Sequence, residues 1–188
     1  METGFWEMIK KRAGWLAVLF VGEMLTATAM AHYEDQLARA VILAVFVPLI
    51  ISSGGNSGSQ AATLVIRSMA VGELRLRDWW RTLARELPIG LILGLALAAI
   101  GVARILVWQA VAGTYGDHAV AIAATIGVSL VGVVLWGTLS GALLPFCLRA
   151  VGVDPASASA PFVATMVDVS GLIIYFSVAN VTLRGSLL

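Results

Sequence analysis

Five stretches of this sequence are long and apolar enough to cross a lipid bilayer, which leaves little room for any other kind of fold. We expect helices over residues 13–31, 36–69, 87–108, 119–148 and 155–183. Each is close to or above the roughly 20 residues that span a hydrocarbon core of about 30 Å. With 60% hydrophobic and only 12% charged residues, the chain is too apolar for a soluble domain. The predicted fold class is therefore all-α: a polytopic membrane protein with five transmembrane helices.

A block of polar and small residues lies within the second predicted helix. Residues 48–67 read PLIISSGGNSGSQAATLVIR. At about 100° per residue, the polar side chains of this block fall on one side of the helix. They are Ser52, Asn56, Ser59, Gln60, Thr63 and Arg67. Gly54 and Gly58 have the spacing that lets helices approach closely in lipid. The polar stripe is expected to face protein or a water-filled path, and simple polar packing between two helices explains its composition equally well.

Basic residues are distributed unevenly between the two ends of the predicted helices. If the N-terminus is cytoplasmic, nine of the twelve lysine and arginine residues lie on that side. They are Lys10, Lys11, Arg12, Arg67, Arg75, Arg77, Arg81, Arg85 and Arg149. The positive-inside rule then predicts a cytoplasmic N-terminus, with residues 1–12 as a cytoplasmic lead-in, and a C-terminus on the opposite side. Residues 71–86 contain Trp79 and Trp80 among several arginines. We therefore interpret this segment as a membrane-surface anchor and not as a nucleic-acid site.

Only two carboxylates lie well inside the predicted helices, Glu23 and Asp168. A charged group at mid-membrane costs about 2.5–3.5 kcal/mol, so each is a functional candidate. Asp168 shares a helix face with other polar or small residues. They are Ser157, Pro161, Ala164, Thr165 and Gly171. No lysine or arginine is expected at the depth of Asp168, which favours an ion path over an ion pair. Glu23 has apolar neighbours in sequence, and we interpret it as a protonated or hydrogen-bonded structural residue.

The available donor atoms are those of a hard cation site. Pro161 removes a backbone donor and exposes the carbonyl of Ser157, so backbone oxygen can join side-chain oxygen on that face. The single cysteine, Cys147, excludes an internal disulfide and is expected to pack in the core. One aspartate per chain suits Mg²⁺, which retains several of its waters. Two facing copies of Asp168 would form a doubly negative ring. We find no nucleophilic triad or phosphate-binding loop, and predict that the chain is not an enzyme.

The sequence resembles the membrane domain of MgtE-type magnesium channels, a family that includes the eukaryotic magnesium solute carriers. The resemblance runs from about residue 15 to residue 179. It rests on the motif at 48–67, Arg-Glu-Leu at 85–87, Leu-Pro at 144–145 and VDPASASAPFVATMVDVSGLIIYFSVA at 153–179. It implies a homodimer whose ion path lies between the second and fifth helices of both chains. It also implies that Asp168 selects the ion with help from the Ala164 carbonyl, and that Ser59 and Thr63 line the pore.

These observations together predict Mg²⁺ transport across the inner (plasma) membrane by a homodimer in contact with lipid. The expected metal-site residues are Asp168, Ala164, Asn56, Ser59, Thr63 and Thr165. Members of the resembled family carry an N-terminal cytoplasmic domain and CBS domains. We expect this chain to hold the pore domain over residues 13–184 without them, with residues 1–12 as the end of the connecting helix. Two alternatives stay open: a carrier coupled to protons or sodium, and a non-conducting structural subunit.

Overall fold

The structure is a computed structural model that describes residues 4–184, apart from the side chains of Lys11 and of residues 157–159. Within that range the ordered elements are all helical. They are α1 (Phe5–His32), α2 (Glu34–Arg39), α3 (Val41–Ala70), the 3₁₀ turn η1 (Leu76–Asp78), α4 (Trp79–Ala112), the 3₁₀ turn η2 (Gly116–His118), α5 (Ala119–Ala150) and α6 (Pro155–Thr182). Five of the described helices, α1, α3, α4, α5 and α6, are long and apolar enough to cross a membrane. The prediction of an all-α fold with five helices long and apolar enough to span a membrane is confirmed.

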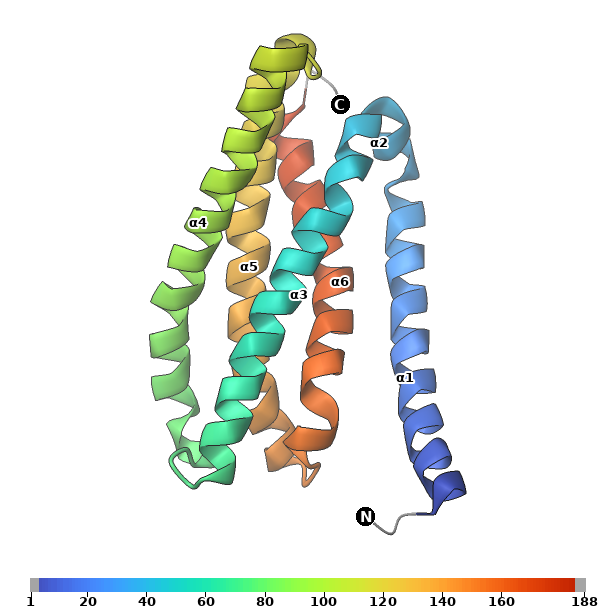
Figure 1. Cartoon of the computed structure of the whole chain (residues 1–188), viewed down its shortest axis with the longest axis vertical. Helices are drawn as coiled ribbons and strands as arrows, with labels where there is room; N and C mark the ends of the chain where they lie inside the picture. The colour runs from blue at the N-terminus through green and yellow to red at the C-terminus, as the bar shows by residue number, and fades with distance from the viewer. Residues whose placement is uncertain (1–3, 185–188) are drawn as a thin grey trace.

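Helix α5 is the centre of the bundle. It packs against α3, α4 and α6, and α3 runs obliquely across the bundle (Figure 1). Helix α1 stands at the edge, and its main contact is with α6. Helix α1 begins and α6 ends at opposite ends of the bundle (Figure 1), as an odd number of membrane-length helices requires.

Glycines bring the backbones of α3 and α5 together. A Cβ atom at Gly58 would stand 2.6 Å from the carbonyl oxygen of Gly137. Likewise, a Cβ at Gly141 would meet the backbone carbonyl of Gly58, and one at Gly137 would meet that of Gly54. No side chain fits at these positions, so the predicted close packing by small residues is confirmed, and it fixes which side of α3 turns toward α5.

The buried apolar residues form a large cluster drawn from α3, α4, α5 and α6, and a second, smaller cluster of α3 and α5 residues. Leu43 and Ile50 of α3, Ile126 of α5, and Tyr175 and Phe176 of α6 are fully buried in the large cluster. The Tyr175 hydroxyl donates a 3.0 Å hydrogen bond to the carbonyl of Leu43, which satisfies the polar end of an otherwise apolar contact. This bond attaches α6 to the start of α3.

Two helix boundaries differ from those expected. The second predicted helix is divided at Ala40 (φ −129°, ψ 70°), where α2 ends and α3 begins. Ala40 is buried in the core at 3% exposure, so packing bends the chain where no glycine or proline marks a break. The third predicted helix starts early, at Trp79, because Asp78 closes the preceding turn by accepting a 2.9 Å bond from the backbone of Arg75. The predicted start of the last helix is confirmed, since the Asp154 side chain accepts from Ala156 N at 3.0 Å.

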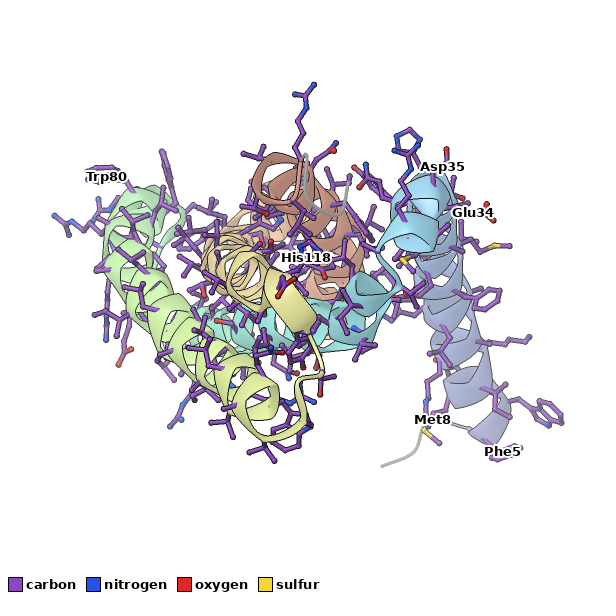
Figure 2. All side chains as sticks on the ribbon, turned by 90° about the horizontal axis from the view of Figure 1, so that it is seen from above. Phe5, Met8, Glu34, Asp35, Trp80 and His118 are labelled. Carbon is purple, nitrogen blue, oxygen red and sulfur yellow. The ribbon has the colours of Figure 1, made fainter. Side chains whose placement is uncertain are left out.

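Helix α1 begins at Phe5, earlier than the expected start of the first helix at residue 13. Most of its large apolar side chains are exposed, and Phe5 and Met8 project away from the bundle (Figure 2). These side chains suit contact with lipid or another apolar surface. A second expectation is wrong: Cys147 is exposed and does not pack in the core.

Candidate ion site

The two sides of α3 differ sharply. Its small residues are buried against α5 and α6, whereas the polar stripe stays at the surface of the single chain: Ser52, Asn56, Gln60, Thr63 and Arg67 are exposed and Ser59 is half-buried. The polar link between α3 and α5 uses another residue, since the hydroxyls of Ser57 and Thr138 are hydrogen-bonded at 2.7 Å. The stripe therefore does not serve as polar packing between α3 and α5.

A cavity of about 390 Å³ lies where α1, α3 and α6 meet. Helix α3 lines it with Ser52, Asn56 and Ser59 among others, and α6 lines it with Ala164 and Asp168. A second cavity of about 510 Å³ shares Asn56 and Ser59 with the first and extends along α3 past Gln60 and Thr63. The two cavities form an open hollow along the stripe, in which polar side chains lie within a larger apolar lining.

Asp168 is half-buried at the α3 side of α6. A Cβ atom at Gly55 of α3 would lie 3.9 Å from its carboxylate oxygen Oδ1 and 3.7 Å from the Cα of Ala164. The missing side chain at Gly55 thus leaves space in front of the carboxylate. Within residues 4–184 no basic side chain forms an ion pair with Asp168, so its charge is open to a cation.

Hydrogen bonds hold the polar side chains of α3 in place. Ser59 donates from Oγ to the carbonyl of Ala160 at 3.3 Å, which joins α3 to α6 beside the cavity. The Thr63 hydroxyl donates to the carbonyl of Ser59 at 2.8 Å, and the Asn56 amide donates to the Ser52 hydroxyl at 3.3 Å. Because the Asn56 amide nitrogen is engaged with Ser52, its other polar atom is an oxygen acceptor, the ligand type that hard cations prefer.

The structure gathers most of the predicted site residues. Asp168, Ala164, Asn56 and Ser59 line the first cavity, and Thr63 lines the second. Thr165 differs, because its side chain is directed to α1, where its hydroxyl donates to Glu23 Oε1 at 3.1 Å. The side chain of Ser157, expected on the same face as Asp168, lies outside the described residues.

Two polar residues of α1 near this site were not expected to take part. The hydrogen bond from Thr165 confirms that Glu23 is a hydrogen-bonded carboxylate against another helix. Its carboxyl group also interacts with that of Asp168, the other carboxylate expected inside the membrane. Thr26 of α1 lines the first cavity. Only two carboxylates lie well inside the predicted helices, which was a signal for their pairing. The face of α1 that contacts α6 could not be predicted, because the sequence of α1 is mainly apolar on all sides.

Five helices of membrane-spanning length, with an open hollow that contains the Asp168 carboxylate, are the features of a polytopic membrane protein. The MgtE family model, described as "Divalent cation transporter", matches residues 47–178, and the chain belongs to this family. The family comprises transporters and not enzymes, in agreement with the expectation from sequence.

Curated relatives extend this similarity over most of the chain. The magnesium transporter MgtE of Thermus thermophilus is 42% identical over 173 residues, which are 92% of this chain and 36% of the relative. The magnesium transporter MgtE of Enterococcus faecalis is 31% identical over 174 residues, 93% of this chain and 37% of the relative. The chain thus spans about a third of the length of these relatives.

Proposed function

We propose that the chain forms a homodimeric pathway for Mg²⁺ across the cytoplasmic (inner) membrane, with residues 13–184 as its pore domain. The observation that carries this proposal is the cavity in which the Asp168 carboxylate faces Gly55, with no basic partner among the described residues. A carboxylate inside a membrane bundle is costly to insert, so a carboxylate without a basic partner there is a candidate for ion binding. The named relatives, which are magnesium transporters, support Mg²⁺ as that ion.

The chemistry of the lining fits a hydrated ion. The Asp168 carboxylate supplies charge, and the Ala164 backbone, Asn56, Ser59 and Thr63 supply oxygen atoms along the hollow. Such a sparse oxygen set suits Mg²⁺, which dehydrates reluctantly and is then bound through its waters. A membrane potential is worth about 2.3 kcal/mol per charge per 100 mV, and about twice that for a divalent ion, so a passive path suffices for uptake.

The exposed polar stripe of α3 supports the dimer. Facing lipid, the polar atoms of the stripe that its internal hydrogen bonds do not satisfy would each cost about several kcal/mol, as other polar groups do in hydrocarbon. A second copy of the chain packed on this side would cover the stripe and bring two Asp168 carboxylates to one path. The basic residues of the α3–α4 turn and the end of α5 lie at the end where α1 begins, which supports a cytoplasmic N-terminus.

The test is Mg²⁺ flux into proteoliposomes under a negative internal potential and without a proton gradient. We expect the native chain to conduct and Asp168→Ala to lose flux while still assembling. Asp117→Ala, which removes a carboxylate from the exposed η2 turn, is the matched control and should conduct normally. Equal flux in native protein and Asp168→Ala would remove Asp168 from the path. Flux that needs an imposed proton gradient would indicate a coupled carrier, and absence of flux in the native chain would favour a structural subunit.

A further inference from the structure

We propose that Glu23 of α1 is a second carboxylate of the Asp168 site and sets its preference for divalent over monovalent cations. The proposal rests on the ion path through Asp168 argued above. Its starting point is the contact between α1 and α6, which brings together two carboxyl groups that lie far apart in sequence.

Glu23 is held toward α6 by a direct bond. The Thr165 hydroxyl donates to Glu23 Oε1 at 3.1 Å, and Thr165 is three residues before Asp168 on the same helix. The preceding residue, Gly22, allows this approach, because a Cβ there would stand 2.6 Å from the Thr165 Cγ2 atom. This contact places the Glu23 carboxyl group within electrostatic reach of the Asp168 carboxyl group, about one turn farther along α6 than Thr165. Gly22 and Thr165 therefore place the Glu23 carboxylate beside that of Asp168.

The same face of α1 reaches the cavity. Thr26 lies three residues after Glu23, which is the spacing of neighbours on one helix face. It lines the cavity that contains Asp168, and its Oγ1 atom is buried without a hydrogen-bond partner among the described residues. A buried hydroxyl without a partner is rare in folded proteins, so this atom is available to a polar occupant of the cavity, such as the water shell of an ion.

The charge of the pair explains why it would favour a divalent ion. Two carboxylates side by side repel each other in a medium of low dielectric constant, and a dication between them neutralises both, whereas a monovalent cation neutralises only one. Glu23 is exposed at the surface of the single chain, so a hydrated ion can reach it without unpacking the core. The rest of α1 presents mainly apolar side chains to its surroundings, and the carboxylate occurs where the helix meets α6.

The test compares Glu23→Gln with native protein in proteoliposomes, recording the Mg²⁺ concentration for half-maximal flux and the ratio of Mg²⁺ to Na⁺ flux. We expect the half-saturating concentration to rise about tenfold or more, and the flux ratio to fall, because a nearby charge is lost. Glu23→Asp retains the charge and should change the ratio less. Glu73→Gln, an equal loss of charge on an exposed loop, should behave as native protein.

Two outcomes separate this inference from the proposed function. If Asp168→Ala abolishes flux but Glu23→Gln keeps the native half-saturating concentration and flux ratio, the role of Glu23 is wrong and the path through Asp168 stands. If Asp168→Ala conducts normally, the path itself is wrong. Should Glu23→Gln fail to assemble, Thr165→Val removes the hydroxyl that holds Glu23 with little change in shape. Thr165→Val should then raise the half-saturating Mg²⁺ concentration and lower the flux ratio, each by less than Glu23→Gln would. A native concentration and flux ratio in Thr165→Val would overturn the proposal.

Discussion

Gly55 of α3 stands opposite Asp168 of α6, so close that a Cβ at position 55 would lie 3.9 Å from the carboxylate oxygen Oδ1. That distance is an ordinary van der Waals contact, so the methyl group of Gly55→Ala would occupy the space before the carboxylate without displacing either helix. We expect Mg²⁺ flux per inserted chain to fall while the midpoint of thermal unfolding in detergent stays near the native value. Flux and unfolding are measured on the same preparation.

Gly54→Ala is the matched comparison for Gly55→Ala. Its Cβ would stand 2.5 Å from Val133 Cγ1 and 2.9 Å from the Val133 carbonyl oxygen, so α3 and α5 would have to separate. We therefore expect Gly54→Ala to lower the unfolding midpoint. If Gly55→Ala is destabilised to the same degree, a blocked cavity is not the reason for its lost flux.

The contact between α3 and α5 predicts a large stability cost at Gly141. A Cβ there would meet the backbone carbonyl of Gly58, which cannot rotate away as a side chain could. Gly141→Ala should destabilise the bundle by about 1–3 kcal/mol, the usual cost of overpacking. Gly14→Ala places the same methyl group in α1 with nothing within 4 Å, and should be neutral or slightly stabilising because alanine favours the helix over glycine. Equal unfolding midpoints for the two variants would contradict the close contact.

The Tyr175 hydroxyl predicts a stability effect without a transport effect. Tyr175→Phe keeps the buried ring but removes the 3.0 Å bond to the Leu43 carbonyl, at a cost of about 1 kcal/mol. Mg²⁺ flux should not change, because neither residue lines the cavity of Asp168. Tyr33→Phe retains its stacking on Phe176 and serves as the control. If Tyr175→Phe lowers the Mg²⁺ flux per folded chain, the prediction of a stability effect without a transport effect is wrong.

The proposed dimer predicts a cross-link through α3. In a Cys147→Ser background, which removes the exposed native cysteine, Gln60→Cys should form disulfide-linked dimers on mild oxidation. Ile100→Cys is the control, because Ile100 is 66% exposed on α4, away from the polar stripe. Dimers are quantified by non-reducing electrophoresis of membranes. Cross-linking at position 100 but not at position 60 would place the second copy on a different face.

Much of the architecture could be predicted because the membrane limits the choices. Long apolar runs had to become helices, and the glycine spacing identified the packed side of α3, which the contacts of Gly58 with Gly137 confirm. The Asp154-Pro155 pair marked the start of α6 because its cap is local. The bend at Ala40 was missed, since it depends on burial of an alanine that has no local preference to end a helix.

The candidate site was predictable in its members and less so in its geometry. The polar residues of α3 and Asp168 stood out by their cost in an apolar segment, and the structure brings four of them to one cavity with Ala164. The direction of Thr165 was not predictable, because a helical wheel gives its face but not which neighbour occupies that face. The position of Glu23 depends in the same way on how α1 rotates against α6.

The opposite locations of the start of α1 and the end of α6 limit how this unit can be duplicated within one polypeptide. Joining two copies head to tail by a short linker would insert the second copy upside down, because its first helix would enter from the far side. A single-chain version with parallel halves needs an added crossing segment between them. A polypeptide that contains two fused copies of this unit would therefore have either an additional membrane-spanning helix between them or two halves with opposite orientations in the membrane.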